Sequence, residues 1–243
     1  MNIDIEKYRY AAHRGLYDNN NGIPENTIPA FEKAVEKGYA IELDVQLSND
    51  GFLVVFHDDT LKRMAGIKDE IAALDLHEIR TVKLLGTDVK IPSFQDVLLC
   101  VAGKVPLIIE VKKSARYKEL LEKLMQELSK YNGDYIIESF DPRVVRWLRL
   151  NEPDVFRGQL SSYNIREVKN RILKVLLGKM VFNPFTRPNF VSYQYLKVNR
   201  KFYAKHHKKK RIVAVWTVKN KVEFEKVKNN ADIIIFENEE TIK

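Results

Sequence analysis

The most constraining feature of this 243-residue chain is the regular alternation of short β-rich runs with helical patterns. Eight runs rich in apolar and β-branched residues predict strands: Tyr8–Arg14, Ala40–Leu47, Pro106–Lys112, Tyr135–Phe140, Phe156–Ser161, Asn189–Gln194, Arg211–Val218 and Ala231–Glu237. Between most of them lie helical patterns: Thr27–Lys37, Ser93–Val101, Arg116–Tyr131, Pro142–Asn151, Asn164–Leu177, Lys197–His207 and Lys219–Lys228. Eight strands with intervening helices predict a parallel TIM-type (β/α)8 barrel. An open doubly wound sheet usually has a glycine-rich first turn, which this sequence lacks.

One stretch interrupts the alternation. Phe52–His57 reads as an extra strand just after the second one, and residues 60–92 then reach the third strand without a clear helix–strand unit. We therefore expect a small inserted cap after strand two, at the end of the barrel where loops carry function. Because no repeat, low-complexity tract or Gly/Ser linker is present, we expect residues 1–243 to form a single domain. Only six residues follow the last predicted strand, so no full eighth helix is expected.

Composition indicates a globular protein without a membrane span. The chain has 45% apolar and 30% charged residues, and its apolar runs are shorter than the roughly 18 residues that a spanning helix needs. The N-terminus lacks the basic-then-apolar order of a signal peptide, and the single cysteine, Cys100, cannot form an internal disulfide. A cytoplasmic location is the expectation.

The net charge of +8 is unevenly distributed. Residues 143–211 contain eighteen Lys and Arg against three acids, so this basic segment carries +15 and the rest of the chain −7. Such asymmetry is typical of a surface that meets polyanions, although solvated helix faces explain it equally well. Nucleic acid is not an expected partner, because the segment has no recognisable binding motif and no pattern of aromatics arranged for stacking.

Acidic residues occur on two of the predicted strands. Glu42 and Asp44 are two residues apart, so they share one face of the second strand. Glu110 lies on the third strand, two residues before Lys112. Strands of a parallel barrel are covered on both faces, and unpaired buried carboxylates are costly. One divalent cation would resolve the conflict, and all-oxygen ligands favour Mg²⁺ or Ca²⁺. Ion pairing with Arg14, Lys112 or other bases is the alternative.

Two histidines end apolar strands, where barrel enzymes place catalytic groups. His13 precedes Arg14, and His57 precedes Asp58. Histidine titrates near neutral pH and arginine offers a fork for phosphate oxygens, so these residues predict proton transfer beside a bound phosphate. Lys112 adds a point charge. Trp216, near the end of the seventh strand, is either a wall of the site or a core residue. We find no zinc-type Cys/His spacing, P-loop or nucleophile elbow.

At these residues the chain resembles the glycerophosphodiester phosphodiesterase family. The resemblance spans roughly residues 10–237 and is most specific in the first half. The matching segments are Ala12-His13-Arg14-Gly15, Pro24-Glu25-Asn26-Thr27, Glu42-Leu43-Asp44-Val45, Asp50-Gly51 leading to His57-Asp58, Glu110-Val111-Lys112, Ser139-Phe140-Asp141 and Trp216-Thr217-Val218. One departure occurs at the last strand, where the family usually has a Thr-Asp pair before a proline and this chain has Phe236-Glu237-Asn238.

The resemblance implies a TIM-type barrel with a cap after strand two, and metal-dependent hydrolysis of glycerophosphodiesters to glycerol 3-phosphate and an alcohol. It implies roles for eight residues: His13 and His57 as the acid/base pair, Glu42, Asp44 and Glu110 as metal ligands, Arg14 and Lys112 as phosphate contacts, and Trp216 as a wall for the glycerol part. It gives Glu25 and Asn26 no individual role. Two alternatives remain: phospholipase D-like or C-like action on lysolipids, and a catalytically silent protein that binds a phosphorylated ligand.

Within the basic segment, residues 174–185 mix lysines with large apolar side chains and end in a proline-bounded loop. This composition suits shallow insertion at an anionic membrane surface, which would make the protein peripheral to the membrane. The alternative is that Leu176, Leu177, Val181 and Phe182 pack against the barrel.

Overall fold

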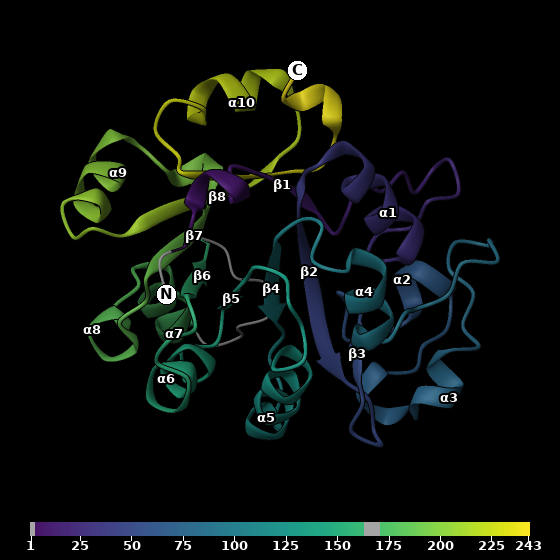
Figure 1. The fold of residues 1–243 in the computed structure, drawn as a ribbon. Coiled ribbons are helices and arrows are strands. Elements are labelled where there is room, and N and C mark those ends of the chain that lie inside the picture. Colours follow the sequence, from purple (N-terminus) through teal and green to yellow (C-terminus); the bar gives the residue numbers. More distant parts are fainter. Residues whose placement is uncertain (1–2, 163–170) are drawn as a thin grey trace. The chain divides into compact units, whose positions relative to one another are not determined.

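A computed structural model describes residues 3–162 and 171–243, which group into two compact units. One unit is Ala12–Tyr135, and the other consists of the N-terminal residues through Ala11 together with Ile136–Lys243. Strand β1 (Tyr10–His13) crosses from one unit to the other, and each unit alternates strands with helices (Figure 1).

The Ala12–Tyr135 unit is built around strand β2 (Ala40–Leu47). Strand β4 (Leu107–Val111) runs parallel to it, with Ile41 opposite Leu107 and Val45 opposite Val111. The short strand β3 (Leu53–Val55) pairs antiparallel with the last part of β2, where Phe52–His57 was predicted to be extended. The unit's three longer helices are α1 (Ile28–Lys37), α4 (Phe94–Val101) and α5 (Tyr117–Leu128).

Residues 60–92 form no helix–strand unit, as the sequence predicts. They contain the short helices α2 (Lys62–Ala65) and α3 (Leu76–Ile79) and a 3-10 turn at Ile71–Ala73. α2 stops at Gly66, whose φ of 74° is left-handed, and α3 begins with a capping box between Asp75 and Glu78. Apolar side chains of this segment form a cluster of their own with β3: Val54, Phe56, Leu61, Met64, Ile71, Ile79, Val82, Leu84 and Ile91. In Figure 1, α2 and α3 are drawn at the right of the view, on the same side as α1 and α4.

In the described part of the other unit, four strands are each followed by at least one helix, and a fifth strand ends the pattern. Its parallel strands pair in chain order: β5 (Tyr135–Ser139), β6 (Arg157–Ser161), β7 (Phe190–Gln194), β8 (Ile212–Val218) and β9 (Ile233–Phe236). Its helices are α6 (Pro142–Asn151), α7 (Arg171–Gly178), α8 (Asn183–Thr186), α9 (Arg200–His207) and α10 (Lys221–Val227). A 3-10 turn, Glu239–Thr241, stands where an eighth helix would begin.

Local signals in the sequence account for these elements. α6 starts with Pro142 at its first position, and the Asp141 carboxylate accepts from the backbone N–H of Arg143. β9 is a continuous apolar run, Ile233 to Phe236, and all four residues are buried, as expected for a parallel strand covered on both faces.

The predicted boundaries agree with the observed strands to within two residues at either end. Helix ends agree less closely. The helix predicted at Asn164–Leu177 is seen from Arg171, because residues 163–170 lie outside the described part.

Helix α7 ends at the carboxyl ends of two strands. The hydroxyl of Ser161, the last residue of β6, donates to the Leu177 carbonyl over 2.9 Å. The hydroxyl of Tyr193 on β7 donates to the Gly178 carbonyl over 3.0 Å. Leu177 itself is buried, which is the packing alternative that the sequence left open for this residue.

Candidate active site

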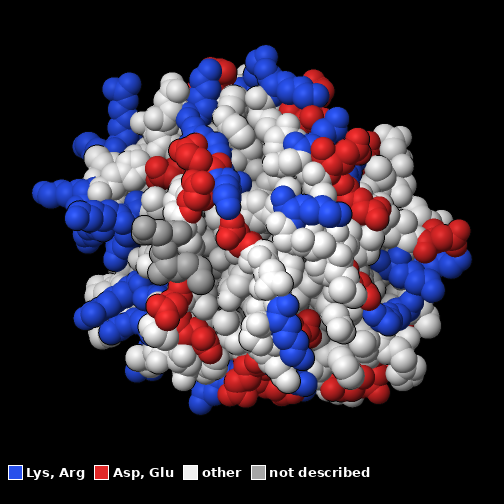
Figure 2. Space-filling model, in the orientation of Figure 1, with Lys and Arg blue, Asp and Glu red and all other residues white. Residues whose placement is uncertain are grey.

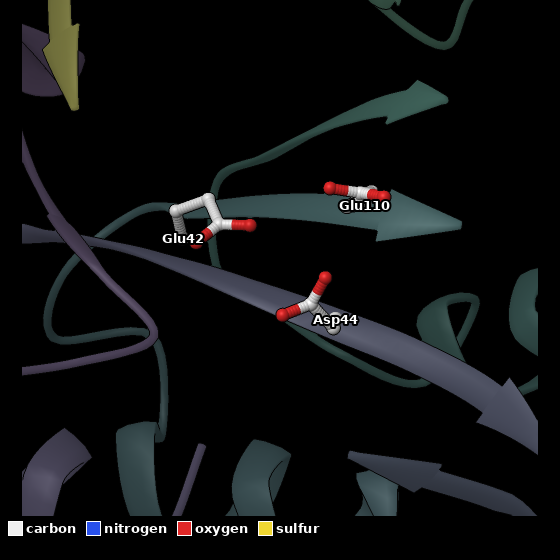
Figure 3. A group of neighbouring side chains, drawn as sticks. All are labelled: Glu42, Asp44 and Glu110. Atoms are coloured by element: carbon white, nitrogen blue, oxygen red, sulfur yellow. The ribbon is translucent and has the colours of Figure 1, made fainter. Parts of the chain in front are cut away.

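Three carboxylates converge on the Ala12–Tyr135 unit. Glu42 and Asp44 project from the same face of β2, and the register places Asp44 directly opposite Glu110 of β4. Figure 3 shows their side chains pointing toward one another. One oxygen from each lies within 4.8 Å of the others, and all three residues are buried. Two ligand oxygens on opposite sides of one Mg²⁺ or Ca²⁺ stand about 4–5 Å apart, so the spacing fits a single ion.

Two cations share this buried space with the acids. Lys112 Nζ lies 2.8 Å from Glu110 Oε1 and 3.3 Å from Asp44 Oδ1, and Arg14 Nε lies 3.4 Å from Asp44 Oδ2. Burial raises the pKa of Glu110. Burial opposes ionisation of Asp44 as well, but the charge of Lys112 and its neighbours holds the Asp44 pKa well below its usual range. The ion pairs considered from the sequence are therefore present.

One of the paired oxygens still lacks a hydrogen bond. Asp44 Oδ1 is buried and lies 3.3 Å from Lys112 Nζ, but it accepts no hydrogen bond from residues 3–162 and 171–243. Three carboxylates face two fixed cations here, which leaves an excess of negative charge in a buried place. An all-oxygen donor set with one unsatisfied carboxylate oxygen fits Mg²⁺ or Ca²⁺, and it suits zinc poorly.

A tight turn at the end of β1 brings His13 and Arg14 to the acids. Arg14 and Gly15 both have left-handed backbone angles, with φ of 56° and 78°. The turn aims the Arg14 backbone N–H at Glu42 Oε2, 3.0 Å away, and His13 Nε2 lies 3.9 Å from the same oxygen. A side chain at position 15 would meet Ala30 of α1 at 2.8 Å, so only glycine fits there.

Asn26 clamps the backbone and side chain of Asp44. Its side-chain amide donates to Asp44 Oδ2 over 2.8 Å, and its backbone N–H donates to the Arg14 carbonyl over 3.0 Å. Asn26 also has a positive φ, 57°, which asparagine tolerates better than most residues. The residue therefore ties the loop before α1 to both β1 and β2.

A chain of polar contacts leads from His57 back to Arg14. His57 Nδ1 lies 2.6 Å from Asp58 Oδ1, and Arg63 contacts both Asp58 and Glu25. Glu25 Oε1 in turn accepts from Arg14 Nη1 over 2.5 Å. Burial opposes ionisation of Glu25, but the hydrogen bonds from Arg63 and the charge of Arg14 lower its pKa to about 2.

Seven of the eight predicted site residues thus lie in one unit. His13, Arg14, Glu42, Asp44, His57, Glu110 and Lys112 belong to Ala12–Tyr135. His57 lies two residues after β3, and its Nδ1 faces the Asp58 carboxylate. Trp216 belongs to the other unit, on β8, where its ring packs edge-on against Phe140 with centroids 5.7 Å apart. Its contact with substrate remains a prediction.

Sequence reasoning missed Arg63 and left Glu25 and Asn26 without roles. Glu25 and Asn26 lie in a segment that resembles the family. The resemblance indicated that they matter but did not indicate what they do. Arg63 lies in residues 60–92, where the absence of periodicity gave no signal at all. The departure at the last strand has a local counterpart, because Glu237 forms an ion pair with Lys219 at 2.7 Å.

Comparison of the sequence with known proteins identifies relatives of this chain. A Caldanaerobacter subterraneus protein named glycerophosphodiester phosphodiesterase is 34% identical over 177 residues, 68% of this chain and 71% of that protein. The uncharacterised protein YqiK of Bacillus subtilis is 35% identical over 162 residues, 62% of this chain and 65% of that protein.

The fold agrees with solved structures. An Oleispira antarctica phosphodiesterase, solved in complex with the product sn-glycerol-3-phosphate, superposes with a TM-score of 0.82 at 19% identity, over 96% of this chain and 94% of that chain. The likeness shows that the fold is the TIM-type barrel of eight parallel strands that the sequence predicts. The profile of the glycerophosphoryl diester phosphodiesterase family matches residues 13–238. The chain therefore belongs to the glycerophosphoryl diester phosphodiesterase family of enzymes.

Proposed function

We propose that this chain hydrolyses glycerophosphodiesters to glycerol 3-phosphate and an alcohol, with one Mg²⁺ or Ca²⁺ as cofactor. The observation that carries the proposal is the trio Glu42, Asp44 and Glu110, buried with oxygens within 4.8 Å of one another and flanked by Arg14 and Lys112. The name of the Caldanaerobacter relative and the product bound to the Oleispira enzyme support the substrate class.

In this proposal Glu42, Asp44 and Glu110 are the ligands of the cation, and Arg14 and Lys112 bind the phosphate. The bound cation supplies positive charge that offsets the negative charge of the phosphodiester and of its transition state. Arg14 offers two parallel N–H groups to phosphate oxygens, and Lys112 offers a single charged donor. Trp216 forms a wall for the glycerol part.

His13 and His57 are the proposed acid and base. One removes a proton from the attacking oxygen and the other gives a proton to the leaving alcohol. His57 Nδ1 faces the Asp58 carboxylate, so Nε2 is the nitrogen that exchanges a proton with the substrate. The attacking group is either water or the glycerol hydroxyl of the substrate, which would form a cyclic phosphate first.

A panel of purified substrates tests the proposal. Glycerophosphocholine, glycerophosphoethanolamine and glycerophosphoglycerol should each release glycerol 3-phosphate, detected with a coupled dehydrogenase. Lysophosphatidylcholine distinguishes lysolipid activity, which would release choline or phosphocholine instead. Binding of glycerol 3-phosphate without turnover of any diester would contradict the proposal and would identify a silent binding protein. We propose further that residues 1–243 act as one phosphodiesterase domain in which residues 60–92 are an insertion.

A second proposal concerns location: a cytoplasmic protein that contacts anionic membrane through α7 and α8. Ile172, Val175 and Phe185 are 73%, 53% and 67% exposed, and Arg171 and Lys179 stand among them. Figure 2 shows Lys and Arg side chains gathered at the left of the view, where Figure 1 has α8 and α9. Exposed apolar side chains beside cations suit shallow insertion into an anionic interface. Within the described ranges, no helix is long and apolar enough to cross a membrane.

Sedimentation with phosphatidylglycerol vesicles tests the membrane contact. Binding should occur at low salt, weaken at high salt, and fall when Ile172→Glu and Phe185→Glu are combined. Val222→Glu is the matched control, because Val222 is as exposed as Phe185 but lies on α10. Absence of binding at low salt, or equal loss with the control, would contradict the contact.

A further inference from the structure

Arg63 joins two carboxylates that the proposed chemistry does not otherwise connect. Its Nη1 and Nη2 atoms donate to Glu25 Oε2 and Oε1 over 2.9 and 2.6 Å, which is a bidentate contact. Its Nε atom donates to Asp58 Oδ2 over 2.7 Å. The Arg63 side chain is 46% exposed, whereas Glu25 is buried. One side chain of the 60–92 segment therefore engages both acids with three N–H groups.

Each of these two carboxylates also contacts a residue of the proposed active site: Asp58 contacts His57, and Glu25 contacts Arg14. The other oxygen of Asp58 faces His57 Nδ1 at 2.6 Å. Because a carboxylate only accepts, the proton lies on Nδ1 and the Nε2 atom of His57 stays available for proton transfer. Glu25 accepts from Arg14 Nη1 over 2.5 Å, which directs the Arg14 guanidinium. Asn19 also contacts Glu25, donating to Oε2 over 3.2 Å.

We propose that Arg63 is a positioning residue: through Asp58 it orients His57, and through Glu25 it orients Arg14. The inference rests on the proposed function, because it assigns a purpose to contacts around the same site. It adds that the 60–92 segment, and not the barrel strands alone, holds the proton-transfer and phosphate-binding groups in register.

The backbone that carries Arg63 is itself held in place. Its neighbours Leu61 and Met64 are buried in the apolar cluster of the 60–92 segment, and the Leu85 N–H donates to the Met64 carbonyl over 2.7 Å. A planar guanidinium can serve two carboxylates at fixed angles, but an ammonium cannot. The position therefore requires arginine for geometry and not for charge alone.

Kinetics of four variants test the inference. Arg63→Ala should lower kcat/KM about 10–100-fold, the usual effect of losing a group that orients an active-site ligand. Asp58→Asn should act mainly on kcat, through His57, and Glu25→Gln mainly on KM, through Arg14, whereas Arg63→Ala should change both. Arg63→Lys should recover only part of the loss. The losses of Arg63→Ala and Asp58→Asn should be smaller together than their product, since both act through His57.

Arg80→Ala is the matched control. Arg80 lies in the same segment, is 50% exposed and pairs with Asp96 at 2.6 Å, but it contacts none of the site residues. Its kinetics should equal those of the wild type. Melting temperatures of both Arg→Ala variants separate positioning from unfolding, and if Arg63→Ala does not fold, Arg63→Lys carries the test.

Nitrogen NMR of the histidine side chains provides a readout that does not depend on turnover. In the wild type, His57 should hold its proton on Nδ1, and in Arg63→Ala both tautomers should be populated. An unchanged His57 spectrum together with wild-type kcat and KM in Arg63→Ala would overturn the inference. A wild-type chain that hydrolyses no diester would overturn the proposed function instead, and the NMR comparison would still decide on Arg63.

Discussion

The side-chain amide of Asn26, in the loop before α1, donates a hydrogen bond across 2.8 Å to Asp44 of β2, eighteen positions along the chain. This bond occupies Asp44 Oδ2 and leaves Oδ1 directed toward Lys112, at 3.3 Å. Oδ1 is therefore the Asp44 oxygen without a hydrogen bond, and we expect it to be the one that binds a metal ion.

We expect His13→Ala and His57→Ala each to lower turnover of glycerophosphocholine about 10²–10⁴-fold, the usual effect of losing one general acid or base. Both side chains lie at strand ends and are not part of the apolar core, so melting temperatures should change little. Near-wild-type turnover in either variant would show that the assignment of that histidine is wrong.

Removal of divalent metal should abolish activity. The donors Glu42, Asp44 and Glu110 are all carboxylates, so Mg²⁺ or Ca²⁺ added after EDTA treatment should restore at least part of the rate. Glu110→Gln should weaken cation binding measured by calorimetry on the protein without substrate. Full activity in EDTA, or tightly held zinc in metal analysis, would contradict this prediction.

Gly15→Ala should destabilise the fold by about 1–3 kcal/mol. The positive φ at this position is strained for alanine, and the added Cβ would collide with Ala30. Gly38→Ala is the control, since Gly38 has a similar φ of 72° but a Cβ at that position would meet no atom within 4 Å. Chemical denaturation of both variants isolates the collision as the difference between them. Equal losses of stability would mean that only the backbone angle matters.

Acid should destabilise the protein partly through Glu25. Its pKa is about 2 in the folded protein against an ordinary 4.5, so folding favours the ionised form. The resulting stability is fully present above pH 4.5 and is lost as the pH falls toward 2. Melting temperature measured between these pH values should fall less steeply in Glu25→Gln than in the wild type. Parallel curves would indicate that Glu25 does not contribute.

Much of the fold and of the acid cluster follows from local patterns. Continuous apolar runs such as Ile233 to Phe236 predict buried parallel strands, and the two-residue spacing of Glu42 and Asp44 predicts a shared face. Adjacent strands then bring Glu110 beside them. These inferences need only the two-residue repeat of a β-strand and the run of apolar residues, and both can be read from the sequence.

The contacts of Arg63 could not be predicted in this way. Arg63 and Glu25 are thirty-eight residues apart, and Arg63 lies in a segment whose path depends on its own apolar cluster. The exposure of single residues was equally hidden, because Leu177 and Val175 are both apolar and helical, yet one is buried and the other exposed. Which of these side chains is buried depends on which turn of α7 contacts Ser161 and Tyr193. That contact belongs to the tertiary structure and leaves no local pattern in the sequence.

Strand β2 pairs with β4 from Ile41 to Val45, the stretch that carries both acids, and with β3 from Val45 to Leu47, just beyond them. The backbone that carries Glu42 and Asp44 is thus ordered by the sheet itself. The protein backbone therefore loses little conformational entropy when a cation binds to these carboxylates. The free energy of binding is then set mainly by charge and by dehydration of the ion. In some proteins the ligands come together only when the metal binds, whereas the ligands here are preorganised. Chelation should therefore remove activity without unfolding the protein.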